Sequence, residues 1–487
     1  MKKYNITRIW VIFLAITIST ASCSDWLDVQ PRSQIRDTVL FSDQLGFKSA
    51  LAGVYSILTD RDLYAVELRF GMLGTLAQEW NAPTSNAARY WGEANYDFYA
   101  TSVVRRIDSI WGRTYHAIAN VNVILEMLED RQHLFTGINY EIIKGEVLAL
   151  RAFLHFDLLR LFGASFAVDP NRPSIPYVTV YGPLQSPQLR VWEAMERVLA
   201  DFALAAEYLK VDPIHTGQVI TVMDDNGWLI NRTRRLNYYA LRGLQARAFL
   251  WMQDFPNAAL HAQKVIDAAD AGKFRWTTLA GMQLHDRTGA HEQLWGLEVN
   301  NMNELHTEFF TAGAGNLLQI TTTGVLQNIY FGGASEAPLD WRFVNLFIPN
   351  ATNSILQKFA LPPAATTAFY RNRMPMIKLP EMYFILAEAQ FERDLPFLDA
   401  LNEVRRHRGL GDHLLTDPAL TPEVFYGILA NEVRREFLGE GQLWFFHKRQ
   451  NRPIIRLAAH DLVELNAYIF PLPIAEREGA NRQDNRN

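Results

Sequence analysis

Aromatic and amide side chains gather between residues 80 and 99, in a stretch that lacks helical periodicity. A flat ring can stack on an apolar face of a ligand, and amide or guanidinium groups can pair with its polar groups. Loops that join rigid elements often carry such residues. The same rings could equally belong to the core, because Trp and Tyr bury readily. The candidate ligand-binding residues are Trp80, Asn81, Arg89, Tyr90, Trp91 and Tyr96, with Asn86, Asn95 and Tyr99 in the same cluster.

A second aromatic group lies between residues 295 and 341. Several of its members are Phe, which has no polar group to orient a ligand, so core packing is the better interpretation. The weaker binding candidates in this group are Trp295, Tyr330 and Trp341, with Asn300, Asn301, Phe309, Phe310 and Phe331 beside them in sequence.

Catalytic and metal-binding patterns are weak. Glu432, Glu436 and Glu440 recur at helical spacing, as the paired carboxylates of a hydrolase could. Arg434 and Arg435 alternate with them, which favours a salt-bridged helix face. No G-x-S-x-G motif occurs, and the histidines form no metal-spaced set. We therefore predict no catalytic residue, no metal site and no cofactor, and we expect His155 to be a hydrogen-bonded core residue.

Cys23 is the only cysteine, and it ends a segment with the layout of an export signal. A basic head with Lys2, Lys3 and Arg8 precedes an apolar run from residue 9 to residue 18. That run is shorter than the ~20 residues that a spanning helix needs. Small residues then lead to a thiol that has no disulfide partner, which resembles a bacterial lipoprotein signal. We predict a signal peptide over residues 1–22 and lipid on Cys23, the alternative being an exported chain with an incidental free cysteine.

Composition limits the class of protein. The 487 residues are 49% hydrophobic and 12% aromatic, which is enough to bury a large core. The net charge is -5 and there is no basic run, so we predict no nucleic-acid partner. After residue 22 no segment is long and uncharged enough to span a membrane. The predicted arrangement is a folded body that the lipid on Cys23 alone holds to a membrane.

Apolar periodicity predicts a mainly helical body. Apolar steps of three and four residues run from Arg105 to Asp130 and from Glu141 to Phe162, where Gly163 supplies a stop. Four prolines make residues 171–187 an extended connection. Helical hairpins with small-residue contacts follow, in the style of tetratricopeptide repeats. The further helices are predicted over residues 191–209, 236–252, 258–269, 379–392, 396–407 and 422–438.

Between about residues 272 and 373 the helical periodicity fades, and Thr and Gly clusters appear among aromatic residues. We interpret this stretch as an irregular, loop-rich lobe inserted into the helical body. The predicted organisation is a single domain over residues 23–487, of which the lobe is part.

Several segments resemble the SusD/RagB family. Residues 145–163, GEVLALRAFLHFDLLRLFG, are similar to its signature helix, and a proline-bearing strand follows at residues 174–178. Residues 23–28 resemble its lipidated start, and the resemblance covers nearly the whole chain in order. His447 departs from the polar or acidic residue that the family usually places there. The C-terminal half adds ALNEVRRHRG at 400–409, EVRREF at 432–437, EGQLWFF at 440–446 and FPLP at 470–473.

The resemblance implies a tetratricopeptide-like helix-pair scaffold with a loop-rich lobe. It also implies a non-catalytic lipoprotein of the Bacteroidota outer membrane, facing the exterior. Such proteins capture oligosaccharides and deliver them to a partner SusC-like TonB-dependent barrel transporter. Glycan sites in the family draw partly on the region that corresponds to residues 80–99.

Three alternatives stay open at this point. The first is a RagB-like protein that binds peptides for an uptake system. The second is a surface hydrolase, and the third is a structural lipoprotein with no small ligand. Some relatives bind a structural calcium ion, for which the sequence locates no ligands.

Overall fold

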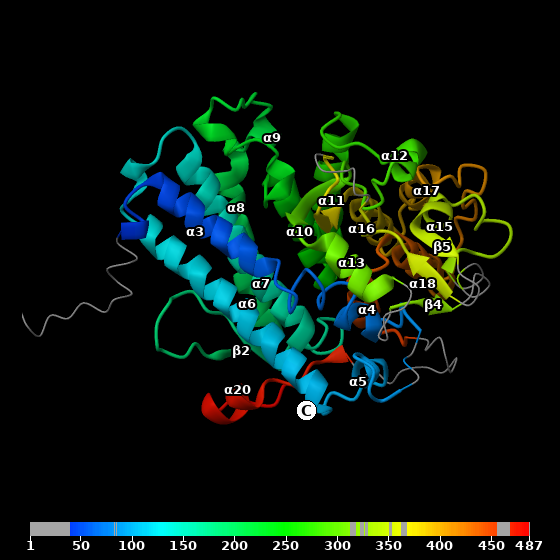
Figure 1. Ribbon diagram of the computed structural model, residues 1–487, viewed down its shortest axis with the longest axis horizontal. Helices are drawn as coiled ribbons and strands as arrows, with labels where there is room; N and C mark the ends of the chain where they lie inside the picture. Colours follow the sequence, from blue (N-terminus) through cyan, green and yellow to red (C-terminus); the bar gives the residue numbers. More distant parts are fainter. Residues whose placement is uncertain are drawn as a thin grey trace, which may run out of the picture.

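The computed structural model describes residues 39–486 except 82, 84, 312–317, 322–325, 327–329, 350–352, 362–367 and 455–467. Cys23 and the predicted signal peptide therefore lie outside the described residues. The described chain is mainly helical, as predicted, and the helices form a curved array seen in Figure 1. No helix among the residues described is both long and apolar enough to cross a membrane.

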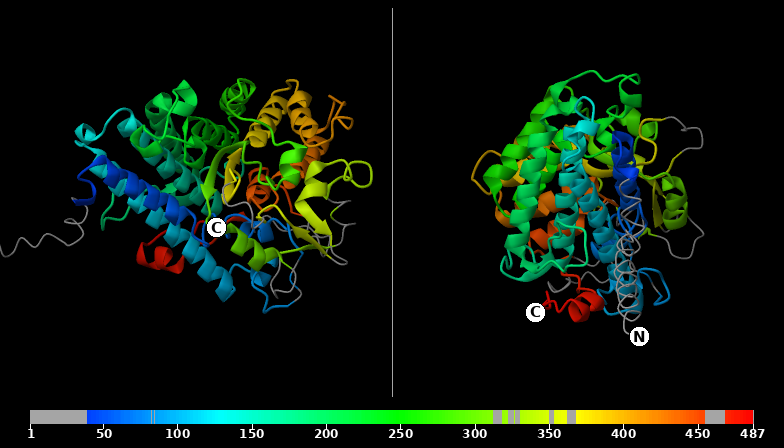
Figure 2. Two further views of the ribbon diagram at one scale, coloured as in Figure 1. Left: turned by 45° about the horizontal axis from the view of Figure 1, so that its top comes forward. Right: turned by 90° about the vertical axis from the view of Figure 1, so that its left-hand side faces the viewer.

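The scaffold consists of paired helices. Helix α3 packs on α6, α7 on α8, α10 on α11, and α16 on α17. Contacts between α6 and α7, between α8 and α10, and between α11 and α16 join these pairs into one continuous layer. Figure 2 shows this layer from two further directions. The long scaffold helices are α3 (Gln44–Leu58), α6 (Thr101–Leu128), α7 (Asn139–Phe162), α8 (Val191–Tyr208), α10 (Tyr238–Trp251), α11 (Phe255–Asp270), α16 (Leu379–Phe391), α17 (Leu398–Arg406) and α18 (Pro422–Glu436).

Local sequence explains where these helices begin and end. Asn237 caps α10 by accepting the backbone N–H groups of Tyr239 and Ala240, and Thr421 caps α18 just before Pro422. Helix α7 ends at Phe162, one residue before Gly163, as predicted. Most of α7 is buried around its whole circumference, because neighbouring helices cover it on both sides.

Short helices connect the scaffold to its ends and loops. Helix α19 follows α18 directly, and α20 lies beside the N-terminal end of α6 at the bottom of Figure 1. The short elements are α4 (Met72–Leu76), α5 (Trp91–Ala94), α9 (Pro213–Thr216), α12 (Leu279–Gln283), α13 (Met302–Phe310), α15 (Trp341–Leu346), α19 (Gln442–Arg449), α20 (Ile474–Gly479) and the 3-10 turns η1 (Gln132–Leu134), η2 (Leu209–Val211), η3 (Asp225–Gly227) and η4 (Arg232–Arg234).

Among the residues that the structure describes, the strands form three small antiparallel sheets. In the predicted extended connection, β1 (Pro173–Pro176) pairs with β2 (Gln188–Arg190). Within the lobe, β6 (Asn353–Leu356) lies between β4 (Ile320–Thr321) and β5 (Phe347–Pro349). The third sheet pairs β3 (Gln293–Glu298) with β7 (Arg373–Lys378).

One part of the predicted lobe over residues 272–373 is regular and buried. Strand β3 is buried along most of its length, and β7, with which it pairs, runs directly into α16 of the scaffold. The part of the lobe around β3 therefore belongs to the core. Helical periodicity fades there because β3 is a buried strand, which carries no period of 3.6 residues.

Candidate functional site

The predicted ligand cluster divides into buried and exposed members. Trp80 is only 3% exposed, its indole N–H donates to the Phe70 carbonyl at 2.8 Å, and its ring packs edge-on against Phe310. Tyr90 is also 3% exposed, and its hydroxyl lies 3.2 Å from both carboxylate oxygens of Glu67. Neither ring has a free face, so the expectation that they stack on a ligand is corrected: both are core residues.

Arg89 and Asn81 tie this segment to the lobe. The Arg89 guanidinium pairs with Glu308 at 2.8 Å and lies over the Phe309 ring at 4.7 Å. The backbone N–H of Asn81 donates to the Gln319 carbonyl at 2.7 Å. Both residues are half-buried, and these contacts hold residues from distant parts of the chain together.

Tyr96 and Trp91 are half-buried as well. The Tyr96 hydroxyl donates to the Leu76 carbonyl at 2.7 Å, and its ring packs against the core. Trp91 is the first residue of the short helix α5. Trp91 thus keeps part of its surface accessible, whereas Tyr96 is bound to the end of α4.

The weaker candidates from the lobe are mostly core residues, as the better interpretation had it. Trp295 and Tyr330 are fully buried, and the Tyr330 hydroxyl donates to the Glu79 carbonyl at 2.9 Å. Trp341 begins α15 and is half-buried against the core.

Tyr99 differs from the rest of the cluster because 77% of its surface is exposed. It lies on the wall of a hollow of about 390 Å³, here named the Tyr99 hollow. This volume falls within the usual range for small-molecule sites, ~300–1,000 Å³. The polar residues that line the Tyr99 hollow are Tyr99, Ser165, Arg172, Lys448, Asn451, Tyr468, Arg477, Asp484 and Arg486.

Segments far apart in the chain build the Tyr99 hollow. Tyr99 precedes α6, Ser165 lies in the loop that follows Gly163, and Lys448 is in the last turn of α19. The C-terminal segment forms another wall. It is held by the Phe470 N–H, which donates to the Leu161 carbonyl at 3.1 Å, and by the Asn485 amide, which donates to the Phe162 carbonyl at 2.5 Å.

Cations dominate the lining of the hollow. Arg486 lies over the Phe98 ring at 5.5 Å and over the Tyr99 ring at 5.8 Å. Lys448 is almost fully buried, and burial lowers the pKa of its ammonium well below the usual value, with the Arg160 guanidinium adding to the shift. A positively charged, concave surface next to an exposed ring can hold a polar ligand that has one apolar face.

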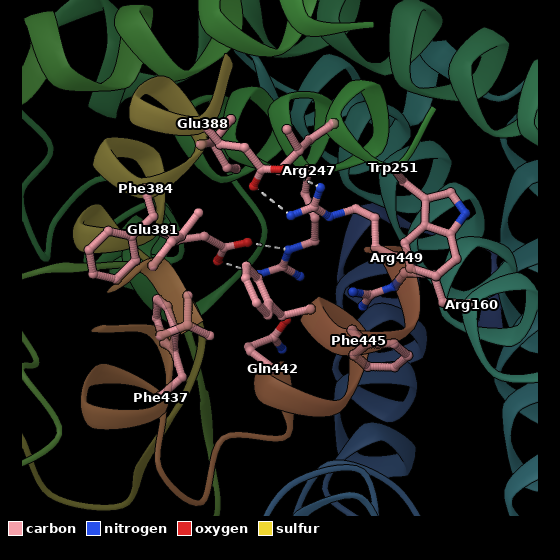
Figure 3. Close-up of a pocket in the computed structure, with 15 residues that line it drawn as sticks. Arg160, Arg247, Trp251, Glu381, Phe384, Glu388, Phe437, Gln442, Phe445 and Arg449 are labelled. Carbon is pink, nitrogen blue, oxygen red and sulfur yellow. Dashed lines mark hydrogen bonds and ion pairs between the residues drawn. The ribbon is translucent and has the colours of Figure 1, made fainter. Parts of the chain in front are cut away.

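A second cavity, of about 70 Å³, lies between α7, α10, α16, α18 and α19 (Figure 3). Arg247 makes two hydrogen bonds of 2.6 Å to Glu381, and Arg449 pairs with Glu388 at 2.5 Å. Figure 3 shows these two ion pairs, whose glutamates Glu381 and Glu388 both belong to α16. The space could hold a few water molecules and is too small for an oligosaccharide. The ion pairs in its lining join α10 and α19 to α16, which gives these residues a structural role.

The glutamates of α18 and the turn after it are buried in an ion-paired core. Glu436 lies 2.9 Å from Arg408 and 3.0 Å from Lys378, and Glu432 lies 2.6 Å from Arg405. These cations hold the pKa of Glu432 near 2 and that of Glu436 well below its usual range. The predicted ion pairing is confirmed. Within the helix, Arg435 pairs with Glu432 at 2.9 Å, and most of the other partners come from other elements.

His155 is a core residue, as predicted. Its Nδ1 lies 2.8 Å from the Arg151 carbonyl, and its Nε2 accepts the Val178 N–H at 2.9 Å. Burial lowers the pKa of His155 to about 3, so the ring is neutral. Within the described part of the chain, no group of three His, Cys, Asp or Glu side chains could hold a metal ion.

Sequence reasoning missed most of the Tyr99 hollow. Ser165, Lys448 and Arg477 lie in three separate segments, and only Arg477 belongs to a segment that resembles the family, its closing segment. Only Tyr99 was within the predicted cluster. The one available signal was that residues 440–446 and 470–473, which resemble segments of the SusD/RagB family, lie next to lining residues of the hollow.

Comparisons with known proteins agree with this fold. The family model SusD-like_3, described as "Starch-binding associating with outer membrane", matches residues 25–215. The chain is 24% identical over 176 residues to SusD-like protein P25 of Formosa agariphila, a match that spans 35% of this chain and 32% of that protein.

Solved structures match over nearly the full length. A SusD superfamily protein of Bacteroides thetaiotaomicron superposes with a TM-score of 0.72 at 18% identity, covering 91% of this chain and 99% of the other. A SusD-like carbohydrate binding protein of Bacteroides vulgatus gives a TM-score of 0.65 at 16% identity, covering 85% and 84%. The family model matches the N-terminal part of the chain, and the solved structures show that the chain has the fold of SusD superfamily proteins.

Proposed function

We propose that this protein captures oligosaccharides at the outer membrane and delivers them, without catalysis, to a partner TonB-dependent transporter. The observation that carries the proposal is the match of residues 25–215 to a family described as starch-binding and associated with the outer membrane. The Tyr99 hollow supports it, because an exposed ring beside hydrogen-bonding groups suits the apolar face and hydroxyls of a sugar.

Ligand binding is tested by calorimetric titration of the purified protein with neutral oligosaccharides, acidic oligosaccharides and peptides. At least one glycan should bind. Tyr99→Ala should weaken the binding of that glycan about tenfold, since a stacked ring contributes about 1 kcal/mol. Tyr181→Ala is the matched control, because Tyr181 is 59% exposed and does not line the hollow. Binding of peptides but no glycan would replace the proposal with the RagB-like alternative.

The hydrolase alternative is tested in the same samples. The three glutamates that could have formed a carboxylate pair are at most 4% exposed and held by cations. We therefore expect the glycan to be recovered intact after long incubation. Release of shorter products by pure protein would contradict the non-catalytic assignment.

Anchoring depends on Cys23, where we propose that lipid is attached after removal of residues 1–22. Cys23→Ala should leave a folded protein that is lost from washed membranes, because no other spanning or anchoring segment is predicted. Palmitate labelling of the wild-type and variant proteins provides the measurement. Protease digestion of intact cells then tests whether the body faces the exterior.

A transporter partner is tested by affinity purification from native membranes in mild detergent. A stable complex of this kind commonly buries more than ~2,000 Å², so it should survive gentle chromatography. Recovery of the chain alone from its natural membranes would favour a structural lipoprotein with no transport role.

A further inference from the structure

Lys448 is a buried cation without a carboxylate partner among the described residues. It is 1% exposed, and its ammonium donates to the Arg160 carbonyl at 2.5 Å and the Leu161 carbonyl at 3.3 Å. The ammonium also lies 5.1 Å from the centre of the Trp444 ring. Carbonyls and a ring face orient a cation, but they supply no full negative charge to offset the cost of its burial.

Two other buried lysines of the core have the carboxylate partner that Lys448 lacks among the described residues. Lys358 and Lys378 are as deeply buried as Lys448, and each lies within 2.9 Å of the Glu440 carboxylate. Lys448 instead lines the Tyr99 hollow, which opens to solvent past Tyr99. The open space beside Lys448 is therefore where a counter-ion could enter.

Ser165 marks the same floor of the hollow. Its side chain is 4% exposed, and its hydroxyl has no hydrogen-bond partner in the structure. A buried hydroxyl with no partner is costly unless something else pairs with it. Ser165 and Lys448 both line the hollow, so one anionic group could accept from the hydroxyl and the ammonium together.

The rim of the hollow carries further positive charge. Arg172, Arg477 and Arg486 line it, against the single lining carboxylate of Asp484. Arg172 also pairs with Asp169 at 3.3 Å, whereas Arg477 is exposed and has no ion-pair partner among the residues described. The charge balance of the rim thus favours an anion over a neutral molecule.

We infer that the Tyr99 hollow binds a glycan that carries an anionic group, either a uronate carboxylate or a sulfate ester. The anion lies at the floor against Lys448 and Ser165, and the apolar face of a sugar ring lies on Tyr99. This inference rests on the proposed function and adds the substrate class to it.

The experiment titrates the full mature chain with trigalacturonic acid, a sulfated carrageenan tetrasaccharide and maltotriose. One of the two acidic probes should bind at least tenfold more tightly than maltotriose, and which one does so identifies the anion. Lys448→Met should weaken the binding of that probe about tenfold or more, because a hydrogen bond to a charged group is lost. Raising the salt concentration should weaken the binding of the acidic probe further.

Arg477→Gln is the second variant, because this exposed side chain can be changed without disturbing the fold. This substitution should weaken the binding of the acidic probe about threefold. Arg393→Gln is the matched control: it makes the same charge change on an exposed loop after α16, away from the hollow.

The outcomes separate the inference from the proposed function. Tight binding of maltotriose, equal in wild type and Lys448→Met, would overturn the inference and leave carbohydrate capture standing. Acidic probes that bind equally to wild type, Lys448→Met and Arg477→Gln would place the anion elsewhere and also overturn it. Binding of none of the three probes would count against both.

Discussion

Two regions rich in basic residues show opposite solutions to the burial of charge. In the ion-paired core around Glu436, carboxylates pair with guanidinium and ammonium groups from several elements. At the Tyr99 hollow, Lys448 is equally buried and meets only carbonyls and a ring. The difference teaches that burial of a charge does not by itself indicate function. The informative feature is a buried charge without its opposite, next to open space.

The largest expected effect comes from breaking the paired region. Glu436→Gln removes the charge that offsets Arg408, Lys378 and part of Arg342. We expect the free energy of unfolding to fall by about 3–5 kcal/mol, because buried cations are left uncompensated. Denaturant unfolding measures it. Glu423→Gln is the control, since Glu423 is exposed on the same helix and should change stability by less than about 0.5 kcal/mol. Equal effects of both changes would contradict the comparison.

An aromatic pair sharpens the contrast between core and hollow. Trp80→Ala should lower the free energy of unfolding by about 3–5 kcal/mol, because the ring is buried and hydrogen-bonded. Tyr99→Ala should change it by less than about 0.5 kcal/mol and weaken ligand binding instead. Thermal and denaturant unfolding of both variants provide the test. A large fall in the free energy of unfolding of Tyr99→Ala would show that this ring contributes to the stability of the fold.

Acid should weaken the paired region first. The pKa of Glu432 is about 2 in the folded protein, against about 4.5 for an ordinary glutamate. Between these values the unfolded chain binds a proton that the folded protein does not, so stability is lost as the pH falls from about 5 toward 2. Glu432 alone accounts for about 3 kcal/mol of this loss. In Glu432→Gln that part of the acid dependence should be absent, and an unchanged pH profile would contradict the assignment.

The smallest expected effect is at the unpaired cation. Lys448→Met removes both the cost of burying a charge and two hydrogen bonds to carbonyls. These terms oppose each other, so we expect the free energy of unfolding to change by less than about 1 kcal/mol at pH 7. Because the folded pKa of Lys448 is lowered, the unfolded chain binds the extra proton, and the wild type should gain stability relative to the variant as the pH rises toward 10.5. A loss as large as that of Glu436→Gln would make Lys448 structural.

The scaffold was predictable from the sequence because its signals are local. The stripe predicted over residues 141–162 and helix α7 agree to within two residues at each end, and Gly163 marks the stop. Strand β3 was not predictable, because its partner β7 lies far along the chain and a buried strand has no distinct period. Short buried elements are fixed by such long-range pairing rather than by local propensity.

The candidate site was less predictable than the fold for the same reason. Trp80 and Tyr99 have similar neighbourhoods in sequence, and only the three-dimensional packing buries one and exposes the other. The surroundings of Glu436 were equally hard to predict. Helical spacing shows which residues share one face of a helix, but it does not show which other elements pack against that face. Lys448 became a candidate only when its surroundings could be inspected for a missing charge.

The C-terminal wall of the Tyr99 hollow has a consequence for biosynthesis. Tyr99 is synthesised well before Phe470 and Asn485, which hold that wall against α7. The helix pairs can form from neighbouring segments, but the hollow requires contact between segments that lie far apart in the sequence. The protein should therefore acquire its scaffold before its hollow, and an intermediate in which the segment around Phe470 and Asn485 has not docked on α7 would have folded helix pairs and an incomplete hollow.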